Sequence, residues 1–296
     1  MHLGNIFSAL LSWCSARSQG LGFEVRLEDI DERSRSEYAE QLLDDLKWLG
    51  IDWDHDPLVQ SRRNDAYTNA LKQLEQVAHI YPCFCSRAEL HATSAPHASD
   101  GTFVYQGTCK GLSDEQIAKK ERVRPGSLRI EVPDRTICFE DKCLGIIEQN
   151  LASECGDFVL RRSDGRFAYQ LAVVVDDIEL GVSEVVRASD LASSTPRQIW
   201  LYELLGAAKC SYAHHPLLLA PDGKRLSKRE KSLDMGCIRK AFAHREDVVG
   251  RLAYLAGLLD EPQALSAQEL AELFDWKYVV KSDIVVDSFG PIASIY

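Results

Sequence analysis

The chain has 296 residues, of which 45% are hydrophobic and 27% are charged. Together with 18 glycines and 10 prolines, this composition is typical of a globular protein and excludes collagen-like, coiled-coil and wholly disordered chains. The formal net charge of −11 makes the chain a poor non-specific binder of nucleic acid, so an RNA partner would need a local basic patch. At roughly 150 residues per domain, the length predicts about two structural units, or one domain with insertions.

The sequence contains no segment typical of membrane insertion or export. No apolar stretch approaches the roughly 20 residues that span a bilayer, and no apolar run follows a basic start. We therefore expect a cytoplasmic protein without a membrane partner, and we expect a monomer. In the cytoplasm the nine cysteines are mainly reduced, so a cluster of them indicates a metal site more than disulfides.

Local patterns in the N-terminal part of the chain predict an α/β arrangement. Apolar residues at spacings of three and four predict a helix over 5–18, and alternation of apolar and charged residues then predicts a strand over 23–28. A second helix is predicted over 38–49, where the apolar spacing of three and four returns. A third helix begins at about Asn64 and is broken before Pro82.

The periodicity is lost from residue 83 to about residue 156. This stretch is rich in Ser, Thr, Gly and Pro and reads as an irregular insertion between two halves of an α/β unit. Regular order then resumes, because apolar residues at 158–160 and 167–171 flank a turn at 163–166. That pattern predicts a β-hairpin.

Two helix starts and one basic run mark the remainder. Thr195 and Gln198 form a capping-box pair with proline between them, which predicts a helix start. Residues 224–231 form a basic run, which directly follows a turn. The end of the chain is predicted to be helical, with a second capping box at Ser266 and Glu269.

Two short constellations suit phosphate chemistry. His2-Leu3-Gly4-Asn5 stands directly before the first helix, where free N–H groups and the helix dipole favour an anion, and Gly4 lets a nucleotide approach the backbone. The basic residues of 224–229 suit the charge that develops on a transferring triphosphate. Taken singly, a segment such as residues 2–5 is more often an N-terminus without a binding role, and a basic run such as residues 224–229 is more often a solvated surface.

Taken together, these two segments resemble the paired ATP signatures of class I aminoacyl-tRNA synthetases. Four further segments are similar to the glutamyl-tRNA synthetase family: VRLEDID at 25–31, FAYQLAVVVDD at 167–177, VRASDL at 186–191 and STPRQ at 194–198. Within that family the chain resembles the short paralogues, the glutamyl-queuosine tRNA(Asp) synthetases. It ends soon after the second signature, and its cysteine insertion has the spacing of the paralogues. The resemblance covers about residues 2–275.

The resemblance implies an α/β fold, with a Rossmann-like parallel sheet of the class I synthetases, a zinc-bearing insertion and a short C-terminal helical region. We accordingly expect the first half of the catalytic domain at 1–82, the insertion at 83–156, the second half at 157–235 and the helical region at 236–296.

The implied reaction uses ATP, with Mg²⁺, to activate L-glutamate, and then transfers glutamate to the queuosine base of tRNA(Asp). Two alternatives stay open. One is a fragment of a full synthetase that charges tRNA(Glu), and the other is a non-catalytic remnant that binds RNA.

The family motifs also imply the residues of the site. ATP is expected to be held by His2, Asn5 and Lys228, and glutamate by Glu28, Tyr169 and Arg187. Arg187 is suited to clamp a carboxylate and Glu28 to accept from an ammonium group. Without the family motifs, a surface ion pair of Glu28 and Arg187 and a buried hairpin aromatic at Tyr169 would be the preferred interpretation.

Cys83, Cys85 and Cys109 are candidates for a zinc site. Thiolates are good zinc ligands, and three of them supply most of a tetrahedral shell, although free buried thiols are the alternative. The resemblance makes Tyr105 the fourth ligand. Substitutes that the fold could bring near are Cys138, Cys143 and His97.

One departure from the family lies at the start. Members carry an Arg-Phe-Ala-Pro-Ser-Pro-Thr-Gly strand and loop before the His signature, whereas here Met1 directly precedes His2. We expect the chain as given to be a weak or inactive catalyst, because the sheet would lack an edge strand and Arg187 a partner arginine. An N-terminally extended chain should then exchange pyrophosphate into ATP faster than this one.

Lys228 is predicted to serve adenylate formation. Lys228→Ala should slow glutamate activation and leave the fold intact, because a lysine in a loop contributes little packing. Glutamate-dependent ATP–pyrophosphate exchange measures this directly. Equal rates for the variant and the parent would make the second ATP signature a false match.

Overall fold

The computed structural model describes residues 1–30, 36–92, 104–226, 234–286 and 289. In these ranges the α-helices are α1 (Leu3–Ser18), α2 (Ser36–Leu49), α3 (Asn64–Val77), α4 (Arg87–Ala92), α5 (Asp114–Glu121), α6 (Tyr169–Leu180), α7 (Thr195–Leu204), α8 (Met235–Ala241), α9 (Arg245–Leu255) and α10 (Ala267–Leu273). The strands are β1 (Arg26–Leu27), β2 (Leu58–Val59), β3 (Ile80–Cys83), β4 (Ser127–Ile130), β5 (Thr136–Asp141), β6 (Gly145–Asn150), β7 (Phe158–Arg161), β8 (Glu184–Ala188), β9 (Ser211–His215), β10 (Leu218–Leu219) and β11 (Ile284–Val285). Within the described ranges, none of the helices combines the length and apolar character needed to cross a membrane.

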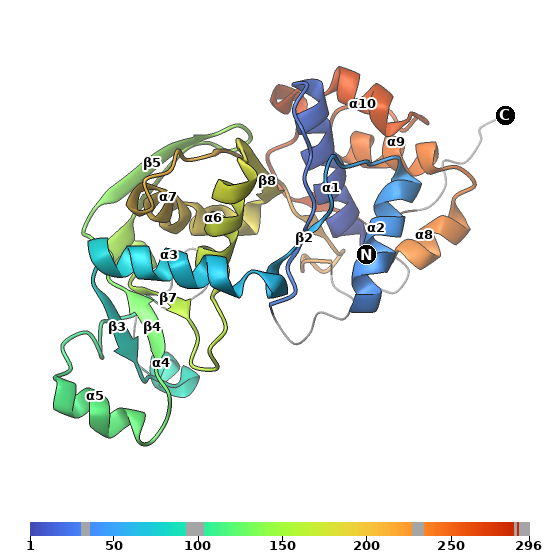
Figure 1. Cartoon of the computed structure of the whole chain (residues 1–296). Coiled ribbons are helices and arrows are strands. Elements are labelled where there is room, and N and C mark those ends of the chain that lie inside the picture. Colours follow the sequence, from blue (N-terminus) through green and yellow to red (C-terminus); the bar gives the residue numbers. More distant parts are fainter. Residues whose placement is uncertain (31–35, 93–103, 227–233, 287–288, 290–296) are drawn as a thin grey trace.

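The predicted α/β fold with parallel strands is confirmed. A four-stranded sheet has the order β6-β5-β9-β8, in which β9 runs parallel to both β5 and β8. A second sheet, β3-β4-β7, is antiparallel. Figure 1 shows β3, β4 and α5 at one end of the molecule and α9 and α10 at the other.

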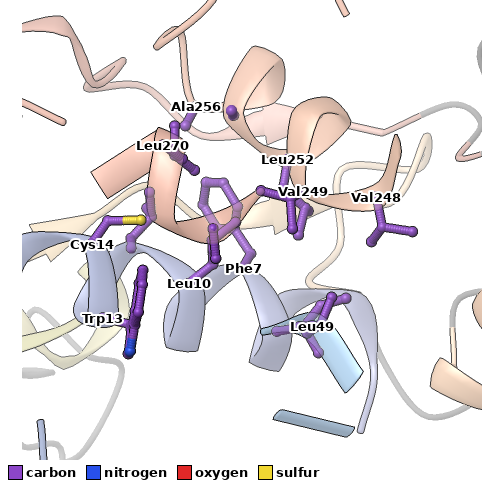
Figure 2. Close-up of a cluster of buried hydrophobic side chains, with 14 of the residues drawn as sticks. Phe7, Leu10, Trp13, Cys14, Leu49, Val248, Val249, Leu252, Ala256 and Leu270 are labelled. Carbon is purple, nitrogen blue, oxygen red and sulfur yellow. The ribbon is translucent and has the colours of Figure 1, made fainter. Parts of the chain in front are cut away.

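The helix predicted over 5–18 is confirmed as α1, which begins two residues earlier at Leu3. Its buried residues include Phe7, Leu10 and Cys14, and they belong to one apolar core with side chains of α9 and α10. Figure 2 shows this packing, with Leu252 and Leu270 on the facing helices. The C-terminal helices therefore hold the first helix, whose N-terminus carries the first predicted signature.

The strand predicted over 23–28 is mostly wrong. Only Arg26 and Leu27 form a strand, which pairs in parallel with β2. The backbone N–H of Phe23 instead donates to the Asp54 carboxylate at 2.6 Å. A side chain thus takes the hydrogen bond that a longer strand would have used.

The hairpin predicted around residues 163–166 is half wrong. Its first strand is β7, but Phe167 makes one isolated bridge to Arg161 and the chain then enters α6 at Tyr169. Residues 171–177 of α6 are all buried, and a short, fully buried helix has the same continuous apolar pattern as a strand. Tyr169 consequently lies at a helix N-terminus.

The stretch from 83 to 156 is more regular than predicted. It contains β4, β5 and β6, and in β5 the side chains of Ile137, Phe139 and Asp141 alternate into the core. Strand β5 joins the sheet of β8 and β9, so this stretch contributes directly to the parallel sheet. The division of the chain into domains stays a prediction.

The two predicted capping boxes have different outcomes. The box at Ser266 and Glu269 is confirmed, with both reciprocal hydrogen bonds present. The box at Thr195 and Gln198 is wrong, because Thr195 is the first residue of α7 and Ser194 is its N-cap without a side-chain hydrogen bond. The Thr195 hydroxyl instead accepts a hydrogen bond from Arg187 at 2.8 Å.

A buried carboxylate, Asp176, ties α6 to the segment that precedes and opens α3. It is fully buried and accepts hydrogen bonds from the Gln60 amide at 2.8 Å, the Arg63 Nε at 2.7 Å and the Tyr67 hydroxyl at 3.0 Å. A buried charge is stable only when it is paired and hydrogen-bonded, and here three donors meet that requirement.

Asp176→Ala is predicted to lower the free energy of unfolding by about 3–5 kcal/mol, because it leaves the buried Gln60 amide and Tyr67 hydroxyl without their acceptor and removes one partner of the half-buried Arg63. The matched control is Glu179→Ala, which removes the exposed partner of the same Arg63 and should cost less than about 1 kcal/mol. Urea unfolding measures both variants. If both variants lost the same free energy of unfolding, the buried hydrogen bonds of Asp176 would not stabilise the fold as predicted.

Candidate active site and metal centre

A cleft of about 750 Å³ collects five of the six residues predicted to bind ATP or glutamate. It is lined by side chains of α1, β1, α6 and β8, and by Arg225 and Leu226 at the start of the second signature. Five predicted residues line it: His2, Asn5, Glu28, Tyr169 and Arg187. The sixth, Lys228, lies outside the described residues.

The N-terminus of α1 faces this cleft. His2 is the N-cap residue, and the first turn of the helix contains no acidic side chain. The positive end of the helix dipole therefore stays available to an anion. Gly4 has a steric role here, because a Cβ at this position would lie 3.3 Å from the Cε1 atom of the His2 ring.

His215, at the end of β9, also lines the cleft and connects the sheet with α1. Its Nε2 lies 2.9 Å from the Ser8 hydroxyl and its Nδ1 lies 2.9 Å from the Pro216 carbonyl oxygen. Burial lowers the pKa of His215 to about 4, so this imidazole is neutral at physiological pH. It does not contribute positive charge to the cleft.

Arg187, in β8, lies at the buried wall of the cleft and is 9% exposed. Its guanidinium donates from Nε to His214 Nε2 at 3.1 Å, from Nη2 to the Thr195 hydroxyl at 2.8 Å and from Nη1 to the Tyr169 hydroxyl at 3.4 Å. No carboxylate of the described residues is among these partners. The positive charge of Arg187 is thus held by neutral groups and stays available to an anionic ligand.

Glu28 is held at the other side of the cleft by an arginine. Its carboxylate accepts from Arg26 Nη2 at 3.2 Å, and Arg26 also forms an ion pair with Asp177 of α6. Glu28 is 46% exposed and lines the cleft. The Tyr169 hydroxyl accepts a hydrogen bond from Arg187, and burial raises the pKa of this hydroxyl.

Cys83, Cys85 and Cys109 converge as predicted and form a group that could hold a metal ion. Their sulfur atoms lie within 4.8 Å of one another, and the Cys85 and Cys109 sulfurs are 3.7 Å apart. Ligands about 2.3 Å from a tetrahedral zinc are separated by about 3.8 Å. The three thiols therefore match the spacing of a tetrahedral metal site.

The Tyr105 hydroxyl, predicted as the fourth ligand, lies beside this cluster. It lies 3.4 Å from the Cys83 sulfur and 3.8 Å from the Cys85 sulfur, and it accepts a hydrogen bond from the Cys109 backbone N–H at 2.8 Å. The guanidinium of Arg129 lies over the Tyr105 ring at 4.0 Å and brings a positive charge close to the thiols. Burial opposes ionisation of Cys83, but Tyr105, the Cys85 backbone and Arg129 together lower the pKa of that thiol.

Two of the three substitutes considered for the fourth ligand, Cys138 and Cys143, lie outside this cluster. Cys143 belongs to the core around α1, where its sulfur contacts the Val280 carbonyl oxygen at 4.0 Å. Cys138 is an exposed residue of β5, opposite Glu148 of β6. His97 lies outside the described residues.

Residues 1–288 match the family model described as "tRNA synthetases class I (E and Q), catalytic domain". The chain belongs to this family. A relative from Symbiobacterium thermophilum, named glutamyl-Q tRNA(Asp) synthetase, is 46% identical over 288 residues and aligns with 93% of this chain and 88% of its own length. A relative of the same name from Nitratidesulfovibrio vulgaris is 46% identical over 272 residues, with 88% and 84% aligned.

Longer members of the class I (E and Q) family are also similar. The glutamate–tRNA ligase of Aquifex aeolicus is 39% identical over 291 residues, which cover 96% of this chain and 61% of that ligase. The crystal structure of a glutamate tRNA ligase from Elizabethkingia meningosepticum, in complex with its amino acid, has a TM-score of 0.80 at 26% identity. The alignment covers 96% of this chain and 64% of that one, so the chain spans about two thirds of this solved relative.

Sequence reasoning missed three polar side chains that lie next to Arg187, behind the wall of the cleft. Thr195 and His214 contact the guanidinium directly, and Asp141 lies behind His214. The only local feature that could have indicated a role for His214 is the pair of histidines at the end of its strand. No local feature indicated a role for Asp141, because its partner His214 is 73 residues away along the chain.

The metal centre yields a direct test. Cys85→Ser should reduce the metal content of freshly purified protein from about one ion per chain to a small fraction, because a hydroxyl is a much poorer ligand than a thiolate. The matched control is Cys138→Ser, which changes an exposed cysteine outside the cluster and should retain the metal. Elemental analysis measures both, and unchanged metal in Cys85→Ser would contradict the assignment.

Proposed function

We propose that the chain activates L-glutamate with ATP and transfers the glutamyl group to the queuosine base of tRNA(Asp). The observation that carries this proposal is the convergence of His2, Asn5, Glu28, Tyr169 and Arg187 on one cleft. The names of the relatives at 46% identity support the same reaction.

The charges of the cleft suggest how glutamate binds. The α-carboxylate must stay free to attack the α-phosphorus of ATP, with pyrophosphate as the leaving group. We therefore assign the side-chain carboxylate to Arg187, in the buried wall, and the α-ammonium to Glu28. Such an arrangement would orient the attacking oxygen toward the N-terminus of α1.

The nucleotide end of the cleft suits the triphosphate. His2, Asn5 and the N-terminus of α1 are proposed to stabilise the phosphates, with Mg²⁺ bound to ATP as part of the substrate. Arg225 lines the same end and pairs there with Asp190. Lys228 follows three residues later in the sequence, and its role with ATP stays a proposal.

We also propose that the metal is zinc, held by Cys83, Cys85, Tyr105 and Cys109, and that it orders the insertion. The apolar cluster around these residues is small, with Tyr81 and Phe84 as its other fully buried members. A bound zinc ion would supply the folding energy that so small a core lacks.

The experiment has two steps. First, exchange of pyrophosphate into ATP is measured with and without L-glutamate. Second, transfer of labelled glutamate is measured on tRNA(Asp) with queuosine, on tRNA(Asp) without it, and on tRNA(Glu).

Glutamate-dependent exchange together with labelling of only the queuosine-containing tRNA(Asp) is the expected result. Labelling of tRNA(Glu) would instead favour the activity named for the Aquifex aeolicus ligase. Absence of exchange would overturn the proposal and leave a non-catalytic RNA-binding protein as the alternative.

Arg187→Gln is predicted to raise the KM for glutamate by about 30-fold to several thousand-fold, because loss of a buried charged contact costs about 2–5 kcal/mol. The KM for ATP should change little, since Arg187 lies away from the N-terminus of α1 in the proposed pose. The matched control is Arg162→Gln, an exposed arginine paired with Asp164. A glutamate KM equal to that of the control would refute the role of Arg187.

A further inference from the structure

Arg187 and His214 are brought together by the sheet itself. They are register partners on the parallel strands β8 and β9, and the Arg187 Nε donates to the His214 Nε2 at 3.1 Å. The Thr195 hydroxyl lies 3.2 Å from the same Nε2 atom and also accepts from the Arg187 Nη2. His214 is fully buried, so these contacts are shielded from solvent.

Asp141 fixes which nitrogen of His214 carries the proton. Its carboxylate lies 2.6 Å from His214 Nδ1 and also accepts the backbone N–H groups of Cys143, Leu144 and His214 at 2.8–3.1 Å. A carboxylate held by several N–H donors stays ionised and can only accept. The proton therefore lies on Nδ1, and Nε2 is left as the acceptor that faces Arg187.

The three contacts of Arg187 also determine which of its donors remain. Nε, one N–H of Nη1 and one N–H of Nη2 are used by His214, Tyr169 and Thr195. Among the described residues this leaves one N–H on each terminal nitrogen. Two N–H groups on the terminal nitrogens of one guanidinium suit the two oxygens of a carboxylate.

We propose that Asp141 and His214 are positioning residues that aim the guanidinium of Arg187 at the side-chain carboxylate of the amino acid, and so make the cleft select glutamate over glutamine. This inference rests on the function proposed above. Neither residue touches the substrate. They act by holding the Arg187 Nε, which sets the direction of the two remaining N–H groups.

Three variants separate positioning from simple stabilisation. In His214→Gln the side-chain oxygen takes the place of Nε2 and keeps the acceptor for Arg187. In His214→Asn the amide takes the place of Nδ1 and keeps the donor to Asp141 but loses that acceptor. In Asp141→Asn the new amide N–H donates to His214 Nδ1, so the imidazole proton moves to Nε2. The Nε2–H and the Arg187 Nε–H are then two donors that face each other, and the hydrogen bond between them is lost.

The readout is the dissociation constant of glutamate and of glutamine, measured by calorimetry on the full chain, together with the KM for each substrate in the exchange assay. His214→Asn and Asp141→Asn should weaken glutamate binding by about 10- to 100-fold, with glutamine binding and the KM for ATP changed by less than about threefold. The dissociation constant of glutamate for His214→Gln should stay within about fivefold of that of the parent. Thermal unfolding is measured in parallel, because a purely structural role would lower the melting temperature without changing the ratio of glutamate to glutamine affinity.

The outcomes are distinct. If the parent binds glutamate and His214→Asn retains its affinity, or if the Asn and Gln variants are equally weakened, the positioning role is overturned while the proposed function stands. If the parent binds no glutamate, the proposed function fails and this inference fails with it. Should His214→Asn not fold, the other two variants still differ: Asp141→Asn is expected to weaken glutamate binding, and His214→Gln is expected to leave it close to that of the parent.

Discussion

The parallel pairing of β8 with β9 is the constraint on which the candidate site depends. It sets Arg187 beside His214 and Ala188 beside His215, so that the strand ends carry the polar groups of the cleft. Ligands of open parallel α/β sheets bind outside the carboxyl ends of the strands. Helix α1 closes the same region, since its Ser8 hydroxyl contacts His215 and its Ser12 hydroxyl donates to the Val186 carbonyl oxygen.

The sequence predicted well those features that depend on neighbours along the chain. Helices α1, α2 and α3, the box at Ser266, and the convergence of the three cysteines follow from local periodicity or spacing. Five residues quoted from the family motifs line one cleft, and this was expected from the family resemblance and not from local patterns. What failed was the distinction between strand and helix at residues 167–171, because the apolar run from Leu171 to Val175 is buried in α6 and shows no period that separates a helix from a strand.

The remaining misses arise from contacts between distant segments. Asp141 lies in a stretch that reads as irregular, and only its pairing with β9 brings it to His214. Thr195 has the sequence of a helix cap, but a nearby arginine uses its hydroxyl. In both cases the tertiary partner determines the role of a polar residue whose local pattern predicts another one.

Helix α6 holds residues on both sides of the cleft in fixed positions. Its first residue, Tyr169, contacts Arg187, while Asp176 and Asp177, two turns further on, are bonded to α3 and to Arg26, the residue that holds Glu28. Both sides of the proposed amino-acid end of the cleft are thus anchored to α6. Groups fixed in this way lose little conformational entropy when a ligand arrives, so this end of the cleft is preorganised for the ligand proposed here.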